Sequence, residues 1–444
     1  MMFLLALGGL SLLLVSGLAL RLAVPLLARL LLPVSLISGF VGVAAGPYGI
    51  DVVPHDIMAL WTGLPSVLIN FVFAGLFLGA PVPSPLTIVR LGGPLVRFSL
   101  VGALGQYVVG LLLTWLVLTP FFGVPALFSC LIEVGFSGGH GTASAMASVF
   151  TDLGFPAGAA LGQMSATIGL VVGVLGGVAL IQRGVRRGDT TQIGSTGAAG
   201  MPQHASGFVP ADARRPIAMG TVSSVVLEPF TLHVAVASLA VLAGWVMLLG
   251  VRALHPSLQG FPLFPLAMVG GMLIQLAADR MGASAWFDRG TFQRIMGLAL
   301  DLLVVAAVAS MQLDLILQNV VPFSLLMAAA VAWVVLTFLW LGPRMLPVDW
   351  FEQAIVVYGT QTGVAAVGLM LLRIVDPHNR TTAAQAFAAR SMVIAPLLGG
   401  GIITATMPLL IQQFGLAPML VAITAATLLC FVWPGPRAAS ALES

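Results

Sequence analysis

Hydrophobic runs of about 20 residues, the length that crosses the hydrocarbon core of a bilayer as a helix, recur along the whole chain. Short segments rich in Gly, Pro and Arg separate them. This pattern predicts an all-α polytopic membrane protein. The predicted helices cover residues 2–20, 33–50, 61–80, 97–119, 157–181, 228–251, 258–278, 295–313, 321–342, 383–406 and 415–433.

One long polar stretch interrupts the apolar pattern. Residues 182–216 are rich in Gly, Ser, Thr, Gln and Arg, a composition typical of a flexible linker. The chain therefore divides into two halves. The predicted domains are an N-terminal transmembrane repeat at 1–181, a cytoplasmic linker at 182–227, a C-terminal repeat at 228–411, and an additional C-terminal helix and tail at 412–444.

Composition supports the membrane assignment and excludes other classes. Hydrophobic residues make up 59% of the chain and charged residues 7%, against about 25% charged in soluble domains. The basic residues cluster at helix ends, so the net charge of +3 does not indicate nucleic acid. Cys130 and Cys430 lie in apolar runs and are expected to pack in the core, with no transition-metal site and no cofactor. No basic residue precedes the first apolar run, which favours a retained helix over a secretory signal.

Arginine placement predicts the orientation. With the N-terminus outside, every arginine except Arg252 and Arg390 falls on the cytoplasmic side, as the positive-inside rule expects. That balance holds only if residues 124–150 and 350–372 each enter and leave the membrane on one side. We therefore predict two re-entrant loops, the first from outside and the second from the cytoplasm.

The two halves resemble degenerate repeats. The recurring features are Pro33 and Gly39 with Pro265 and Gly271, Phe98-Ser99-Leu100 with Phe323-Ser324-Leu325, and the segments that follow Glu133 and Glu352. Five crossings in each half would place the repeats in opposite orientations, the inverted plan of many secondary transporters.

Dense glycine marks the first loop as a candidate binding site. Residues 135–145 read Gly-Phe-Ser-Gly-Gly-His-Gly-Thr-Ala-Ser-Ala, which is unsuited to a regular lipid-facing helix. Non-helical backbone at membrane depth must be buried or line a watery cavity. The candidate substrate ligands in the two loops are Ser137, Gly138, Gly139, His140, Gly141, Thr142, Thr360, Gln361 and Thr362. The alternative is that glycine permits close helix packing, our interpretation of Gly154, Gly158, Gly162, Gly169, Gly173 and Gly177.

Embedded charges provide further candidates. Arg390 could grip a substrate carboxylate, pair structurally with Asp301, or extend to the cytoplasmic face. Asp301 lies near the position matched by Asn70 in the first half, and the candidate sodium ligands are Ser144, Asn70, Asp301 and Gly359. Glu133 and Glu352 are expected to cap broken backbone. His140 could titrate near neutral pH, but is expected to hydrogen-bond loop backbone.

The run Ser137-Gly138-Gly139-His140-Gly141-Thr142-Ala143, followed by the Gly154-to-Gly177 helix with Gly176-Gly177 before basic residues, resembles the bacterial sodium/glutamate symporter family. The likeness covers roughly residues 2–411. It implies ten transmembrane helices in two inverted five-helix domains, each with a re-entrant loop, and sodium-coupled glutamate uptake. The wider class is similar to the citrate carriers, which form dimers and move elevator-fashion. This chain has Thr360-Gln361-Thr362 where the family has Thr-Pro-Thr, and Thr404 where an embedded Asp is expected after Pro396.

The predicted function is therefore sodium-coupled symport of a small organic anion, with glutamate as the first choice, by alternating access. The expected setting is a homodimer in the bacterial inner membrane, with no enzymatic activity and no nucleic-acid partner. Two alternatives remain open. One is a proton-coupled carrier of another carboxylate or amino acid, with Asp301 or His140 titrating. The other is an intramembrane serine protease, because Gly135-Phe136-Ser137-Gly138-Gly139 satisfies G-x-S-x-G and His233 could act as its base.

Overall fold

The computed structural model describes residues 1–29, 32–80, 85–191, 216–255, 258–363, 365–376 and 380–432. Within these ranges the chain is helical and forms no strand. In the described part of the chain, seven helical segments are long and apolar enough to cross a membrane: 2–23, 55–74, 93–122, 157–187, 229–254, 289–309 and 320–345. The predicted all-α membrane class is supported to this extent by length and composition.

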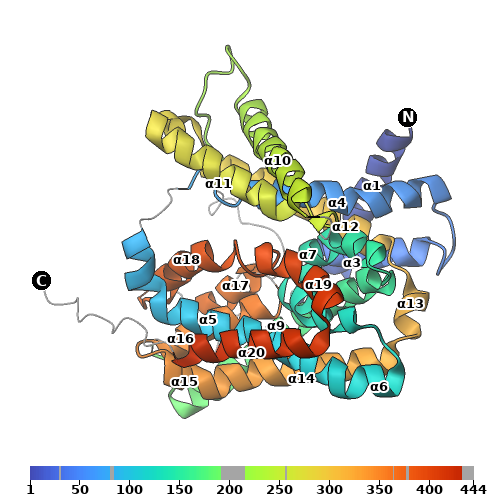
Figure 1. Cartoon of the computed structure of the whole chain (residues 1–444). Helices are drawn as coiled ribbons and strands as arrows, with labels where there is room; N and C mark the ends of the chain where they lie inside the picture. The colour runs from blue at the N-terminus through green and yellow to red at the C-terminus, as the bar shows by residue number, and fades with distance from the viewer. Residues whose placement is uncertain are drawn as a thin grey trace, which may run out of the picture. The chain divides into compact units, whose positions relative to one another are not determined.

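The helices run along the chain as follows (Figure 1). The first half contains α1 (Met2–Ala23), α2 (Pro25–Arg29), α3 (Val34–Ala45), α4 (His55–Ala74), α5 (Pro85–Leu113), η1 (Thr114–Leu118), α6 (Thr119–Phe122), η2 (Ala126–Cys130), η3 (Ile132–Ser137), α7 (Gly139–Ala145), α8 (Ala147–Asp152) and α9 (Ala157–Arg187). The second half contains α10 (Pro229–Leu254), α11 (Phe264–Met281), η6 (Ala283–Trp286), α12 (Arg289–Ala309), α13 (Leu313–Leu317), α14 (Val320–Leu336), η7 (Thr337–Leu341), α15 (Gly342–Met345), α16 (Trp350–Gln361), α17 (Ala365–Val375), α18 (Ala383–Ile394), α19 (Ile402–Phe414) and α20 (Leu416–Val432).

The predicted helix at 383–406 is wrong as a single element. It is broken between α18, which ends at Ile394, and α19, which begins at Ile402. Pro396 follows the end of α18, and two glycines in the break adopt left-handed backbone, Gly399 with φ 66° and Gly400 with φ 102°. A proline and residues with positive φ both stop an α-helix, so the signal for this break was present in the sequence.

Other predicted boundaries also need correction, among them the helix predicted at 61–80, which is α4 (His55–Ala74), and that at 295–313, which is α12 (Arg289–Ala309). The predicted helix at 33–50 forms only the 12-residue α3, because the chain turns after Gly46. The predicted linker at 182–227 begins too early, since α9 continues to Arg187 and ends at Gly188, whose φ is 73°. Gly is common just beyond a helix because it tolerates this backbone. Residues 192–215 of the predicted linker lie outside the described residues.

Both predicted re-entrant segments consist of short helices separated by breaks. The first, at 124–150, contains the 3₁₀ helix η2, the π-helix η3, α7 and most of α8. The second, at 350–372, contains α16 and most of α17, which pack against each other. Each arm is too short to cross a bilayer alone. Entry and exit on one side of a membrane stay a prediction.

The described chain forms two compact units. The first unit comprises residues 1–82, 144–149 and 204–313, and the second 83–143, 150–203 and 314–444. Each unit therefore draws on both halves of the sequence. The predicted repeats at 1–181 and 228–411 divide the chain along its length, and their equivalence stays a prediction.

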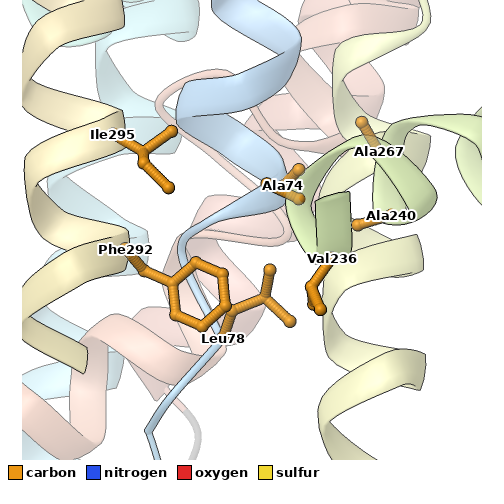
Figure 2. Close-up of a cluster of buried hydrophobic side chains, with 8 residues drawn as sticks. Ala74, Leu78, Val236, Ala240, Ala267, Phe292 and Ile295 are labelled. Carbon is orange, nitrogen blue, oxygen red and sulfur yellow. The ribbon is translucent and has the colours of Figure 1, made fainter. Parts of the chain in front are cut away.

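The core of the first unit lies where α4, α10, α11 and α12 converge. Figure 2 shows the side chains that meet there, with Phe292 and Ile295 of α12 facing Leu78 and residues of the other helices. The labelled members are Ala74, Leu78, Val236, Ala240, Ala267, Phe292 and Ile295. Small alanines on α10 and α11 let these helices approach closely.

The second unit is organised around α5. This helix contacts α14, α18 and α20, and α9 packs against η3, α16 and α17. In Figure 1, α20 and α14 run alongside α5. The second unit therefore contains both predicted loops apart from residues 144–149, together with the broken α18–α19 pair.

The fourth predicted helix of each half carries a π-helical turn near its end. In the first half α5 is followed by η1 and α6, and in the second half α14 is followed by η7 and α15. Each π-helix begins with a buried threonine, Thr114 or Thr337, whose hydroxyl has no hydrogen-bond partner. The two π-helical turns lie at corresponding places in the predicted repeats, whose equivalence stays a prediction. π-helical turns are rare and occur often at functional sites.

Candidate functional site

The first loop lies largely inside the second unit. The π-helix η3 ends at Ser137, where the Gly138 amide donates to the Glu133 carbonyl at 2.8 Å, and Gly139 adopts φ 72°. Ser137 and Gly138 are half-buried, and Gly139 to Thr142 are buried. A left-handed residue between two helical segments redirects the chain, which is why glycine is needed here.

His140 is held against α9 by polar side chains. Its Nε2 lies 3.0 Å from the Thr167 hydroxyl, and the Gln163 amide donates to the His140 carbonyl at 3.1 Å. The ring was expected to hydrogen-bond loop backbone, whereas this contact is with a side chain of another helix. The contacts fix the loop on α9 through both the ring and the backbone of His140.

The second loop presents a different set of groups. The hydroxyls of Thr360 and Thr362 donate to carbonyls of α16, Val356 O at 2.7 Å and Tyr358 O at 3.0 Å. Their oxygen lone pairs remain as acceptors. Gln361 is buried and donates to the Ser99 carbonyl of α5 at 2.9 Å, while Gln106 of α5 donates to the Gln361 carbonyl at 3.0 Å. Gln361 thus anchors the loop end to α5.

Gly169 of α9 lies where the two loops approach each other. A Cβ built on Gly169 would lie 2.5 Å from the Thr362 carbonyl oxygen and 2.7 Å from the Phe136 carbonyl oxygen. Only glycine leaves room for both carbonyls. The predicted packing role of Gly158, Gly162, Gly169, Gly173 and Gly177 agrees with their close neighbours, but Gly154 is a turn residue with φ 80° and open space around it.

Arg390 of α18 is a buried cation, 5% exposed. Its Nε donates to the Ser99 hydroxyl at 2.8 Å, and its guanidinium carbon lies 5.5 Å from the Phe387 ring centroid. Among the residues that the structure describes, no carboxylate pairs with it. The serine that holds Arg390 is also the residue whose carbonyl holds Gln361. The second loop and the guanidinium therefore share one anchor on α5.

Glu133 of η3 is a completely buried carboxylate. Its Oε1 accepts from the Gly399 amide at 2.8 Å and from the Thr404 hydroxyl at 3.0 Å, and its Oε2 accepts from the Tyr107 hydroxyl at 2.7 Å. It therefore binds the α18–α19 break and the first turn of α19, the capping role that was expected. The hydroxyl of Thr142 also approaches the Gly399 carbonyl, at 3.4 Å.

Glu352, the predicted counterpart of Glu133, also caps backbone. Its Oε1 accepts from the amide and the hydroxyl of Thr191 at 2.7 and 2.9 Å, which ties the start of α16 to the chain beyond α9. Its Oε2 is buried and has no hydrogen-bond partner. The two glutamates thus bind different kinds of segment.

The predicted sodium ligands are distributed over both units. Ser144, Asn70 and Asp301 belong to the first unit, and Gly359 to the second. Asn70 of α4 is buried, with Nδ2 donating to the Ser66 carbonyl at 2.8 Å and Oδ1 lacking a partner. Asp301 of α12 is exposed and hydrogen-bonds Ser35. Gly359 is buried against Gly368. A common ion site for these residues stays a prediction. Arg390 pairs with no described carboxylate, so its predicted pairing with Asp301 is not found.

His233 belongs to a structural network of the first unit. Its Nδ1 lies 2.6 Å from the Pro229 carbonyl, and its Nε2 accepts from the Asp288 amide at 2.8 Å. Both ring nitrogens are therefore engaged by backbone, and no free lone pair is left for a catalytic base. This arrangement adds no support to the protease hypothesis.

Several site residues were missed by sequence reasoning: Ser99, Gln106, Tyr107 and the break around Gly399. The available signal was the presence of polar side chains inside the apolar run 97–119, since embedded polar groups mark functional or paired positions. No known protein family matches this chain, and no curated protein matches it either.

Proposed function

We propose that the protein is a secondary active transporter that imports a small organic anion together with a cation, by alternating access of the elevator type. Glutamate is the first substrate to test and sodium the first coupling ion, as the sequence resemblance implies. The observation that carries the proposal is Arg390, a buried guanidinium that pairs with no carboxylate among the described residues.

A buried charge is costly unless it is paired, so an unpaired guanidinium inside an apolar bundle calls for an anion. The guanidinium fork matches a carboxylate, to which it can donate two parallel hydrogen bonds. Ser99 occupies Nε and leaves the terminal nitrogens for such a ligand. A permanently bound anion would serve structure, whereas a transported anion would occupy this position once in each cycle.

The broken backbone around Arg390 favours transport. The second unit contains breaks at Gly138, after Gln361 and between α18 and α19. Discontinuous helices near the membrane midplane are how many secondary transporters expose backbone groups to substrates and ions. Inverted repeats, an inner-membrane location with the N-terminus outside, and a homodimer complete the proposal.

Uptake of labelled L-glutamate into proteoliposomes tests the proposal. An inward sodium gradient is compared with a choline control, and exchange of internal unlabelled for external labelled glutamate is measured in parallel. We expect accumulation that depends on an inward gradient of a coupling cation, either sodium or the proton. Accumulation in choline with a proton gradient would keep the carrier and replace its coupling ion. Absence of both uptake and exchange, for glutamate and for a panel of other carboxylates and amino acids, would overturn the proposal.

A further inference from the structure

We propose that Glu133 is the coupling-cation site of this carrier and that the cation it takes is a proton. The inference rests on the proposed transport function and identifies the second solute moved with the anion. It begins from the charge balance of the second unit, which holds a buried guanidinium and a buried carboxylate, each with only neutral or aromatic neighbours among the described residues.

Glu133 lacks a cationic partner. The titratable side chains that interact with it are Tyr107 of α5 and Cys130 of η2, both neutral at physiological pH, and no described arginine or histidine does so. The elements around it otherwise contribute Thr404 and the Gly399 amide. A buried carboxylate surrounded in this way is compensated by hydrogen bonds alone, and uptake of a cation would remove its charge.

The hydrogen-bond geometry favours a proton over a sodium ion. The carboxylate accepts hydrogen bonds from three described donors: an amide, a threonine hydroxyl and a tyrosine hydroxyl. The Gly399 amide cannot ligate a cation, and Oε1 already accepts two bonds. A proton added to Oε2 can be donated to the Tyr107 oxygen, because a phenolic hydroxyl both donates and accepts. Protonation then leaves both bonds to Oε1 in place, with the proton drawn from the outer aqueous phase and released inside.

The same geometry suggests how the proton and the anion are coupled. Arg390 lies on α18, and the segment that directly follows α18 is the one that Glu133 binds through Gly399. A neutral carboxyl accepts more weakly than a carboxylate, so protonation loosens the tie between η3 and the α18–α19 break. Anion binding at Arg390 acts on the same helix, four residues before its last residue, Ile394. One short helix thus connects both sites.

The transport test uses proteoliposomes in sodium-free choline buffer, an inward proton gradient and labelled L-glutamate. Glu133→Gln is compared with the wild type and with Glu352→Gln, a buried glutamate in the matching position that binds Thr191 instead. We expect Glu133→Gln to lose accumulation and keep exchange of labelled for unlabelled glutamate, and Glu352→Gln to keep both. Accumulation by Glu133→Gln equal to the wild type would overturn the inference, as would sodium-driven uptake that ignores the proton gradient.

A second measurement does not depend on the substrate. The infrared difference spectrum of the purified protein between acid and alkaline pH should contain a buried carboxyl band that Glu133→Gln removes and Glu352→Gln retains. If Glu133→Gln does not fold, Tyr107→Phe keeps the carboxyl and should move the band. Unchanged spectra in these variants would overturn the inference. A carboxyl band with no transport of any anion would instead count against the proposed function.

Discussion

At the scale of the residue, burial makes a charged side chain depend on the few groups that contact it. A guanidinium or carboxylate removed from water loses its hydration and gains stability only from the groups that replace it. Arg390 is met by one hydroxyl and one aromatic ring, and Glu133 by three neutral donors. Neither is neutralised by a described side chain, so each retains the capacity to bind an ion of opposite charge. Asp288 shows the contrasting case, in which a carboxylate serves structure.

Arg390→Lys should raise KM for the anion by roughly 10- to 100-fold, corresponding to a loss of about 1.5–3 kcal/mol of charged hydrogen bonding. Lysine keeps the charge but lacks the fork that binds a carboxylate at two points. Initial uptake rates measured over a range of substrate concentrations check this. Arg344→Lys is the control, because Arg344 is exposed and lies 4.6 Å from the Trp340 ring centroid. An unchanged KM in Arg390→Lys would exclude substrate contact.

Asp288→Ala should lower the free energy of unfolding by about 1–2 kcal/mol, because Asp288 caps α12. Its Oδ2 accepts from the amide and hydroxyl of Thr291, both at 2.7 Å, and from the Met219 amide at 3.2 Å. Burial by itself would raise the pKa of Asp288, but these hydrogen bonds outweigh it and the pKa lies below its usual value.

The pH dependence of this effect has a definite sign. Because the folded pKa of Asp288 is depressed, the ionised carboxylate stabilises the protein above the unfolded pKa, and this stability is lost as pH falls through the folded pKa. The difference in Tm between the wild type and Asp288→Asn should therefore shrink from pH about 7 to about 3. Thermal unfolding in detergent measures it. Asp56→Asn, which replaces an exposed acid in the first turn of α4, is the control variant.

At the scale of the element, breaks in helices position the site. The α18–α19 break turns the Gly399 amide toward Glu133, and the first loop turns at Gly139. Dense glycine led to the prediction of the first loop, whereas the α18–α19 break was missed although Pro396 and the following glycines signal it. The sequence pattern could not identify which side chain binds each backbone group that the breaks leave without a helical hydrogen bond. That side chain lies on a helix far away in the sequence.

Gly399→Ala should destabilise the protein by about 1–2 kcal/mol and also impair transport. Its matched control is Gly123→Ala. Both glycines have nearly the same left-handed backbone, φ 66° and 67°, and open space where a Cβ would be added. The strain is therefore equal, but only Gly399 binds Glu133. Tm and uptake are measured for both. Equal uptake in the two variants would mean that transport does not depend on the backbone geometry of the α18–α19 break.

At the scale of the whole molecule, the chain is assembled from two units that each combine segments of both sequence halves. Such an arrangement suits a carrier with inverted repeats, since corresponding segments of the two repeats can join one unit. The predicted direction in which the chain crosses the membrane follows from the placement of its arginines, by the positive-inside rule.

Cysteine labelling tests the orientation. In a background without Cys130 and Cys430, Phe3→Cys should react with an impermeant maleimide from outside intact cells. Ser206→Cys, in the predicted cytoplasmic linker, should react only after the membrane is disrupted. Phe3 lies at the start of α1, on the predicted outer side, and its side chain is 59% exposed. The reverse labelling pattern would invert the predicted topology.

The sequence by itself determined the helical class, the approximate positions of most apolar helices and the two loop segments at 124–150 and 350–372, but not the break between α18 and α19. These depend on local properties: the length of apolar runs, and the backbone freedom of glycine and proline. Tertiary structure decided which distant groups meet. Glu133 binds Gly399 and Thr404, 266 and 271 residues away, and Arg390 binds Ser99, 291 residues away. Contacts at such separations depend on how the helices pack. The hydrophobic pattern specifies which segments are buried, but it does not specify which buried residues contact each other.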